Sequence, residues 1–263
     1  MNGQPRTAHS FDSTRYRVST IGERTAKSYV VEHHYSHSYP ASKWRFGMFD
    51  GERLCGVLVF GVPTSVRVLT LPFPDLVPYV ESIELSRLVV DDMVPKNGES
   101  WFIARCLEKV QELGVRGVVA FADPTPRKVN GRNIHRGHVG TIYQASNAEC
   151  LGRGTARLLT ILPDGAVLND RSAQKVRSRA SGHIYVHDRL VGFGASPLAD
   201  DDDSAEWLAR ALDEVGAVRL PHRGNWRYVF RLGNRSERRN IRLGLTVGPY
   251  PKLIDNPVTE TSQ

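Results

Sequence analysis

Two polar residues interrupt apolar patterns, and a folded protein must provide partners for them. Arg87 breaks an apolar strand face, and Asp123 ends an apolar run just before Pro124. A buried guanidinium group needs a carboxylate or phosphate partner. Arg87 is therefore either half of a structural ion pair with Glu84 or Asp123, or a clamp on a bound donor or phosphate. Because α/β sheets place their chemistry where strands end, Asp123 either caps the next turn, or it orients an amine or takes its proton.

Three histidines and a tyrosine cluster early in the chain. His33 and His37 are one helical turn apart, and His34 with His37 is also a workable pair. Two histidines together with Asp123 would form the two-histidine, one-carboxylate site that binds Fe(II), with His34 and Asp123 as the candidate ligands. The alternative is that these histidines are surface polar residues. Tyr35 can stack on a base that has left its helix.

The start of an expected helix offers a possible anion site. Ser100 stands where serine commonly caps a helix. The same exposed backbone amides can instead bind an anion, such as the pyrophosphate of coenzyme A or a nucleic-acid phosphate. Gly98 and Ser100, together with Arg87, are therefore candidate cofactor contacts, although Glu99 between them would repel a phosphate.

The hydrophobic periodicity predicts the elements that must position these residues. Apolar runs flanking Asp50-Gly51 are typical of a β-hairpin. We expect strands at 16–21, 44–49, 54–60, 82–90, 118–122, 157–162, 183–190 and 226–232, and helices at 23–36, 100–113, 139–150 and 205–215. This order predicts an α/β protein with a mixed central sheet flanked by helices, as in the GNAT (acetyltransferase-like) fold. In that fold the strand carrying Arg87 and the strand ending at Asp123 would splay apart and admit an acyl donor.

Composition and pattern also predict how the chain is divided. We expect a flexible N-terminus at 1–15, a GNAT-like catalytic core at 16–168, and an inserted segment at 169–225 that could contact DNA. A basic strand region at 226–252 would complete the core, and 253–263 would be a disordered tail. The three cysteines, Cys55, Cys106 and Cys150, have no paired spacing and read as buried free thiols in a reducing cytoplasm. The sequence shows no signal peptide and no membrane-spanning run, so no membrane partner is expected.

The charge of the chain points to a polyanionic partner. The formal net charge is +7 and the pI is about 9.5. The stretch from Arg223 to Arg242, both included, has seven arginines and one acidic residue, Glu237, with Trp226 and Tyr228 among them. Such a run is either a solvated strand edge or a surface for phosphate contacts and base stacking. The candidate DNA contacts are Arg171, Lys175, Arg177, Arg227, Arg231, Arg235, Arg238 and Arg239.

Several segments together resemble the Mom DNA-modification proteins of bacteriophages. They are Glu32-His33-His34-Tyr35-Ser36, Glu84-Leu85-Ser86-Arg87-Leu88, Asn97-Gly98-Glu99-Ser100-Trp101, Asp123, Gly140 to Asn147, Trp226-Arg227-Tyr228 and Gly248-Pro249-Tyr250-Pro251-Lys252. Their order and approximate spacing are those of the family, while 127–136 looks inserted. The resemblance implies an enzyme with a GNAT-like fold that converts adenine in DNA to its N6-carbamoylmethyl form. Such an enzyme would act in the cytoplasm of an infected bacterial host and protect phage DNA from restriction.

The resemblance also implies roles for particular residues. Asp123, Tyr143, His34 and Tyr35 are the expected catalytic residues. Tyr143 falls where acetyltransferases often carry a tyrosine that protonates the leaving group, and its alternative is core packing. The loop at 95–100, with one glycine, only half resembles the phosphate loop of acetyltransferases.

The chemistry of the implied product leaves two donors open. Acetyl transfer from acetyl-coenzyme A would leave a carbonyl on the adenine nitrogen, whereas the implied product carries a CH2 there and ends in an amide. Glycyl transfer, for example from glycyl-tRNA, would leave a free amine that can attack C6 through a five-membered ring and expel the first nitrogen. The expected partners are therefore double-stranded DNA and, for the glycyl route, tRNA. The competing functions are a GNAT N-acetyltransferase of a protein or small molecule, and a non-enzymatic DNA-binding accessory protein.

Overall fold

The computed structural model describes residues 10–129 and 132–252, and these divide into two compact units. Unit 1 contains the chain up to Pro124, His138–Gly154, and the chain from Asn225 onward. Unit 2 contains Thr125–Gly137 and Thr155–Gly224. The core expected at 16–168 is therefore interrupted at residue 125 and ends at residue 154. The reason is that the strand at Arg157–Ile161 pairs within unit 2 and not with the main sheet.

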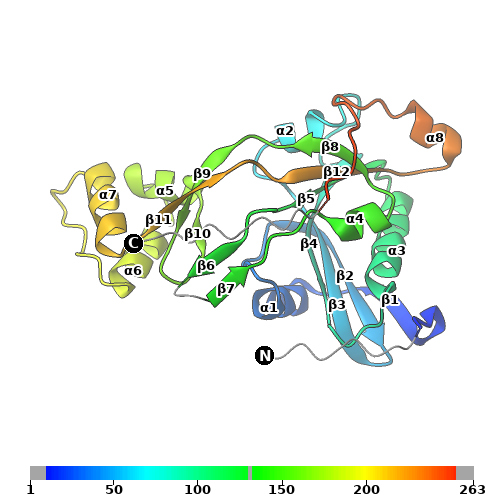
Figure 1. Cartoon of the computed structure of the whole chain (residues 1–263), viewed down its shortest axis with the longest axis horizontal. Coiled ribbons are helices and arrows are strands. Elements are labelled where there is room, and N and C mark those ends of the chain that lie inside the picture. Colours follow the sequence, from blue (N-terminus) through cyan, green and yellow to red (C-terminus); the bar gives the residue numbers. More distant parts are fainter. Residues whose placement is uncertain (1–9, 130–131, 253–263) are drawn as a thin grey trace. The chain divides into compact units, whose positions relative to one another are not determined.

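Unit 1 is built on a seven-stranded mixed sheet with the order β1-β2-β3-β4-β5-β12-β8 (Figure 1). The strands are β1 (Tyr16–Thr20), β2 (Ser42–Asp50), β3 (Arg53–Gly61), β4 (Ser82–Val90), β5 (Gly117–Ala122), β12 (Trp226–Arg231) and β8 (Glu149–Arg153). Neighbouring strands are antiparallel except β4 and β5, which are parallel. Because β12, the last strand within the described residues, lies between β5 and β8, the sheet has the GNAT-like mixed architecture that the element order predicts.

The parallel pair β4–β5 separates part of the way along. Its pairing runs from Ser82↔Gly117 to Leu85↔Ala120 and ends there, although β4 continues to Val90. At the same point the pairing of β4 with β3 passes from Leu85 to Arg87, so that Ser86 is an extra, bulged residue. The bulge bends β4 where the parallel ladder stops, which opens the sheet between its two central strands.

Helices cover both faces of this sheet (Figure 1). On one face, α3 (Gly98–Glu112) buries Phe102, Ile103 and Cys106 against Leu58 and Phe60 of β3. On the other, α1 (Glu23–His33) buries Ala26 and Val30 against Val57 and Val59. Alternate residues of β3 therefore enter opposite cores, as the two-residue period of a strand requires. Short helices α2 (Arg67–Thr70), α4 (Thr141–Ala145) and α8 (Arg235–Asn240), with the 3-10 turn η1 (Ser13–Arg15), complete the unit.

One expectation for unit 1 was wrong. The helix expected at 139–150 ends at Ala145, and the chain turns through Asn147 (φ 61°) into the edge strand β8. Of the N-terminus expected to be flexible at 1–15, residues 10–15 are described, and Phe11 stacks on Tyr16 with ring centroids 4.9 Å apart. Residues 1–9 and the tail at 253–263 lie outside the described residues.

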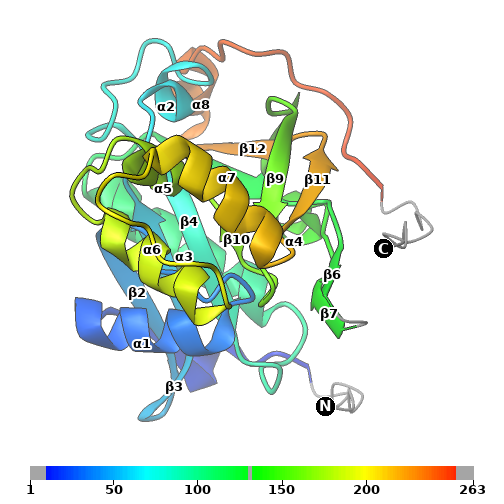
Figure 2. The ribbon, with the colours of Figure 1, turned by 90° about the vertical axis from the view of Figure 1, so that its left-hand side faces the viewer.

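Unit 2 combines two small sheets with three helices. The strands β6 (Arg127–Val129) and β7 (Arg132–His135) pair in antiparallel fashion, and the region that looked inserted in the sequence belongs to this unit. The second sheet has the order β10-β9-β11, from β10 (Val167–Leu168), β9 (Arg157–Ile161) and β11 (Val218–His222). Helices α5 (Asp170–Arg177), α6 (His183–Gly192) and α7 (Ser204–Glu214) lie side by side (Figure 2).

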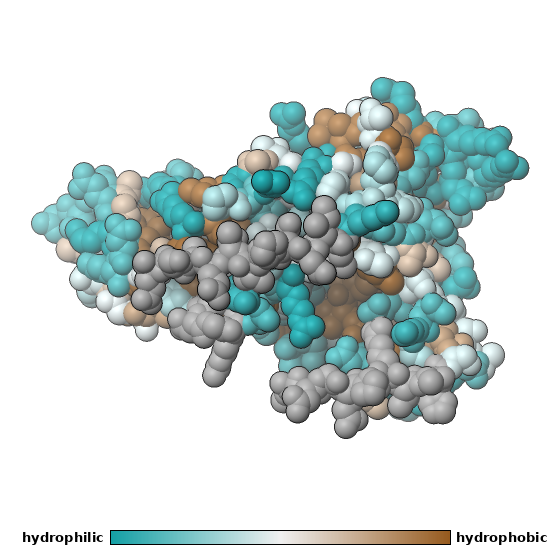
Figure 3. Space-filling model, viewed as in Figure 1, coloured by the Kyte–Doolittle hydropathy of each residue, from teal (hydrophilic) through white to brown (hydrophobic). Residues whose placement is uncertain are grey.

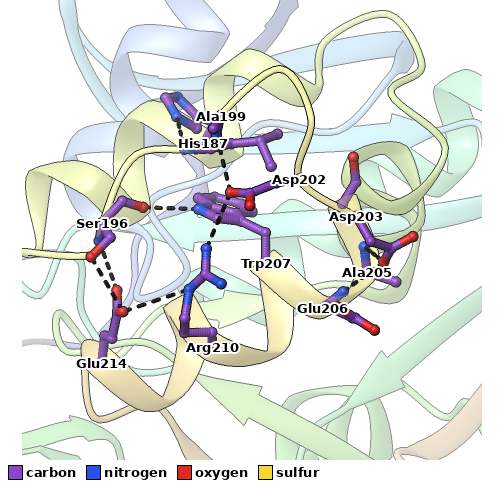
Figure 4. A network of polar contacts seen from close by, with 12 residues as sticks. His187, Ser196, Ala199, Asp202, Asp203, Ala205, Glu206, Trp207, Arg210 and Glu214 are labelled. Carbon is purple, nitrogen blue, oxygen red and sulfur yellow. Dashed lines mark hydrogen bonds and ion pairs between the residues drawn. The ribbon is translucent and has the colours of Figure 1, made fainter.

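The strand expected at 183–190 is the helix α6. Val186 and Leu190, four residues apart, are both buried in the core of unit 2. The third helix, α7, is fixed by polar contacts around Trp207 (Figure 4). The Trp207 indole donates a hydrogen bond to the Ser196 carbonyl oxygen at 2.8 Å, and Glu214 accepts one from the Ser196 amide at 2.7 Å. Unit 2 therefore has a packed core of its own.

Cys55, Cys106 and Cys150 are buried free thiols, as expected. No helix within the described residues is long and apolar enough to cross a membrane.

Candidate active site

A cleft of about 500 Å³ opens in unit 1 where β4 and β5 separate. Its walls come from β4 beyond the parallel pairing, the end of β5, the C-terminal end of α1 and the first turn of α4. The polar and aromatic side chains on it include His33, His34, Tyr35, Glu84, Ser86, Arg87, Glu99, Phe121, Asp123, His138, Tyr143 and Asn225. The structure thus brings together five residues singled out in the sequence, namely His34, Tyr35, Arg87, Asp123 and Tyr143.

His34 and Tyr35 are presented by the end of α1. His34 is the C-cap residue of the helix, and its ring lies 4.2 Å from that of Tyr35. The Ser36 amide donates to His34 Nδ1 at 3.1 Å, and the Ser36 hydroxyl lies 2.8 Å from the same atom. Because Nδ1 accepts a hydrogen bond, the ring proton of a neutral His34 is on Nε2.

Arg87 is held by neutral oxygens. Its Nε and Nη2 donate to the carbonyl oxygen and the hydroxyl of Ser38 at 3.1 and 3.0 Å, and Nη1 donates to the Ser86 carbonyl oxygen at 2.6 Å. The ion pair with Glu84 or Asp123, considered from the sequence, is therefore not what fixes it. Burial lowers the pKa of Arg87, opposed by the effects of Tyr35 and Glu84. The side chain ties the loop after α1 to β4 and leaves a positive charge at the cleft.

Two titratable groups in the cleft have raised pKa values. Burial raises the pKa of Glu84 to about 7, although Arg87 lowers it. Burial also raises the pKa of Tyr143, which is 6% exposed, above its ordinary value. Near neutral pH, Glu84 exchanges its proton readily and Tyr143 keeps its own. A carboxyl and a phenol poised in this way suit proton acceptance and proton donation.

Asp123 and His138 both line the cleft, and their backbones are joined by a hydrogen bond. The His138 amide donates to the Asp123 carbonyl oxygen at 2.7 Å. Burial lowers the pKa of His138, against the opposing effect of Asp123. His138 was missed in the sequence because it follows a polar loop with no periodic pattern. The sequence pointed to Glu84 only as a possible partner of Arg87, and it did not predict that Asn225 and Glu99 would line the cleft.

The proposed cofactor contacts Gly98 and Ser100 do not line this cleft. The Ser100 hydroxyl donates to the Asn97 carbonyl oxygen at 3.0 Å and borders a separate groove with Phe11 and Trp101. A Cβ on Gly98 would lie 2.3 Å from Cγ1 of Val94, so close packing requires glycine there. The residue of this helix start that lines the cleft is Glu99. An acidic side chain and a packed glycine do not make a cradle for the pyrophosphate of coenzyme A.

The expected iron site is not formed by the histidines. His37 Nδ1 lies 2.9 Å from the Val31 carbonyl oxygen, and His34 Nδ1 is engaged by Ser36. Among residues 10–129 and 132–252, no group of three histidine, cysteine, aspartate or glutamate side chains could hold a metal ion. His34 and Asp123 therefore line one cleft without forming a metal-ligand set.

The arginines proposed to bind DNA separate into two kinds. Arg231 makes a bidentate ion pair with Glu149, at 2.8 and 3.0 Å, so it has a structural partner. Arg227 is half-buried on β12 with its guanidinium carbon 5.7 Å from the centre of the Phe121 ring. In unit 2, the exposed Arg171 and Arg177 and the half-buried Lys175 lie on α5.

The arginines of α8 lie on an open surface of unit 1, where Figure 3 shows a hydrophilic coat. Arg235, Arg238 and Arg239 are exposed and line a groove of about 450 Å³ together with Ser146 and Asn147. Their guanidinium groups have no hydrogen-bond or ion-pair partner in the described part of the chain. Three unpaired cations on one short helix are suited to phosphate groups.

Solved structures with distant similarity to this chain include acetyltransferases. An acetyltransferase from Bacillus subtilis in complex with CoA is 11% identical, with a TM-score of 0.36, over 82% of this chain and 99% of that one. A tandem GNAT protein from the clavulanic acid biosynthesis pathway is 10% identical, with a TM-score of 0.45, over 83% and 99%. A GNAT family N-acetyltransferase from Escherichia coli in complex with CoA is 13% identical, with a TM-score of 0.35, over 54% and 72%. A comparison with curated proteins gave no match.

The strand order and the cleft between β4 and β5 define a protein of the GNAT-like class. The profile of the Mom protein family matches residues 15–252, which is most of the chain. The chain therefore belongs to the Mom protein family.

Proposed function

We propose that this protein modifies adenine in DNA by transferring an acyl or aminoacyl group to N6, in the cleft between β4 and β5. The product would be N6-carbamoylmethyl adenine, made in the cytoplasm of a phage-infected bacterium and protecting the phage DNA from restriction. The observation that carries the proposal is the convergence of His34, Tyr35, Arg87, Asp123 and Tyr143 on this cleft in a chain of the Mom family.

The side chains of the cleft suggest a division of roles. The exocyclic nitrogen of adenine is a weak nucleophile, so a base must remove its proton as it attacks the acyl carbon. Asp123 would orient the amine, and Glu84, with its pKa of about 7, would accept the proton. Tyr143, which stays protonated, would donate a proton to the leaving group. Tyr35 and His34 would contact the base, and Arg87 would place a positive charge beside the acyl oxygen.

The donor is the less constrained half of the reaction. The start of α3 does not fit a pyrophosphate, which favours a glycyl donor such as glycyl-tRNA over acetyl-coenzyme A. After glycyl transfer, the free amine would attack C6 of adenine, and the C6–N6 bond would break as the five-membered ring opens. The glycine nitrogen then joins C6, the original N6 ends as the amide, and no oxidant or reductant is needed.

DNA would bind through the arginines of α8. The proposal rests on Arg235, Arg238 and Arg239, whose guanidinium groups are exposed and unpaired within the described residues. The helix α5, with Arg171, Lys175 and Arg177, is the second candidate surface.

Nucleoside mass spectrometry tests the proposal. DNA from cells that express the full chain should contain carbamoylmethyl adenine, and DNA from cells with an empty vector should not. With glycine labelled by 15N, the label should be on the nitrogen attached to the ring and not in the amide. Label that comes from acetate and never from glycine nitrogen would overturn the glycyl route, and unmodified adenine throughout would overturn the proposed function.

A further inference from the structure

We propose that Asn225 reads the target base, its side-chain amide pairing with N6 and N7 of adenine. This inference rests on the proposed function and adds to it the residue that selects adenine. Three features of the cleft carry it: an unsatisfied amide, its place next to Asp123, and the aromatic side chains around it.

The amide of Asn225 has an unused hydrogen-bonding group. Its Oδ1 is buried, has no hydrogen-bond partner, and belongs to a residue that lines the cleft. Buried polar atoms are nearly always paired, so an exception needs an explanation. The backbone of Asn225 is fixed, because its carbonyl oxygen accepts a hydrogen bond from the Gly154 amide at 2.8 Å. A half-turn about the Cβ–Cγ bond exchanges the two ends of the amide without moving this backbone.

The register of the sheet places Asn225 beside the proposed chemistry. β12 pairs with β5 in antiparallel fashion, with Trp226 opposite Ala122. One step further along both strands, Asn225 lies opposite Asp123, and both residues line the cleft. A base whose N6 meets Asp123 would therefore present the same edge to Asn225.

The rest of the cleft is suited to a purine. Phe121 and Tyr35 line it and offer aromatic faces on which a base can stack. An asparagine amide forms a bidentate pair with adenine, accepting a hydrogen bond from N6 and donating one to N7. This pairing uses one hydrogen of the N6 amine and leaves the other for a base. Guanine presents two acceptors at the corresponding positions, so the amide oxygen would face O6 or N7 without a donor.

The test compares adenine with 7-deazaadenine, which lacks the N7 acceptor. Matched duplexes that carry either base would be incubated with the purified full chain and a bacterial extract that supplies both glycyl-tRNA and acetyl-coenzyme A. The unaltered protein should modify adenine about tenfold faster than 7-deazaadenine. N225A should slow the modification of adenine by about tenfold or more and bring the ratio of the two rates close to one. N133A, which changes an exposed asparagine of unit 2, is the matched control and should behave as the unaltered protein.

The outcomes separate the inference from the proposed function. N225D keeps the shape of the side chain but cannot donate to N7 unless protonated, so it should lose the preference even if N225A folds poorly. If either folded variant keeps the preference for adenine, or if the unaltered protein shows none, Asn225 does not read N7. If the unaltered protein modifies neither duplex, the proposed function fails, and this inference fails with it.

Discussion

The β4–β5 cleft and the groove beside α8 are both polar, but the ionisable groups of the cleft are largely buried whereas those of α8 are exposed to solvent. In the cleft, burial shifts the pKa of Glu84, Arg87 and Tyr143. On α8, three arginines stand in solvent without a partner among the described residues. Desolvated groups with altered proton affinity are suited to chemistry, whereas exposed cations give affinity that depends on salt. The difference predicts that turnover and DNA affinity can be changed separately.

Among the substitutions in the cleft, Asp123→Ala should reduce the modification of adenine the most. Removing the carboxylate that meets the amine should lower the yield of modified adenine about a thousandfold, while the affinity for DNA stays nearly unchanged. Nucleoside mass spectrometry and filter binding on the same preparation measure the two quantities. A variant with ordinary nucleoside yield would remove Asp123 from the mechanism.

Glu84→Gln should lower the rate by about a hundredfold at pH 8. A carboxyl that acts as a base works when ionised, so the rate of the unaltered protein should rise with pH through about pH 7. The glutamine variant should lose this rise. Rate measurements from pH 5.5 to 8.5 check the profile, and a rise that survives in the variant would assign it to another group.

The same substitution should change stability with a defined sign. The folded pKa of Glu84 is above its ordinary value of 4.5, so the neutral form is favoured by folding. The stability that this gives is present below pH 4.5 and is lost as the pH rises through about 7. Relative to the unaltered protein, Glu84→Gln should therefore gain about 1–2 kcal/mol between pH 4.5 and pH 8, less than the full shift because the side chain is partly exposed. Urea unfolding at the two pH values measures the gain.

Substitutions on α8 should lower the affinity for DNA and leave the rate of modification unchanged, the reverse of substitutions in the cleft. Replacing Arg235, Arg238 and Arg239 with alanine should weaken DNA binding about thirtyfold and reduce the salt slope by about 3. The rate at saturating DNA should stay unchanged. The matched control replaces three exposed basic residues elsewhere in unit 1, in the variant R24A/K27A/R67A. An unchanged salt slope would place the DNA elsewhere, with Arg171, Lys175 and Arg177 of α5 as the next surface to test.

Arg231 sharpens the comparison, since it is near these arginines in sequence but has a partner. Arg231→Ala should leave Glu149 unpaired and cost about 1–3 kcal/mol of unfolding free energy. DNA affinity should change little. Chemical denaturation measures the unfolding free energy, and filter binding measures the affinity for DNA. If Arg231 were a DNA contact, the substitution would lower the affinity strongly and the stability little.

How much could be predicted depended on whether a pattern was long and regular. β4 was predicted at its observed bounds and β5 within one residue, because their apolar runs are bounded by polar turns. Arg87 and Asp123 were therefore expected at a cleft where the structure has them. β8 was missed because only residues 146–148 separate this five-residue strand from the five-residue helix α4, so neither element is long enough to show a clear period of its own.

Other features left no signal in the sequence. Gly98 is required by the bulk of Val94 and Phe11, which only the packing reveals. Asn225 precedes a strand, and nothing in its spacing distinguishes it from an ordinary turn residue. The ion pair of Arg231 with Glu149 joins residues 82 positions apart, so its charge looked as available as that of Arg235.

The position of β12 between β5 and β8 sets the order in which unit 1 can be completed during synthesis. β5 ends at residue 122, but β12, which pairs with it on the side away from β4, ends only at residue 231. Until β12 has left the ribosome, the side of β5 away from β4 has no strand beside it, and β8 has no strand to pair with. All of unit 2 is encoded between these strands. The nascent chain must therefore carry an open, apolar sheet edge while more than a hundred residues are added, and a chain that stops early would offer that edge to aggregation.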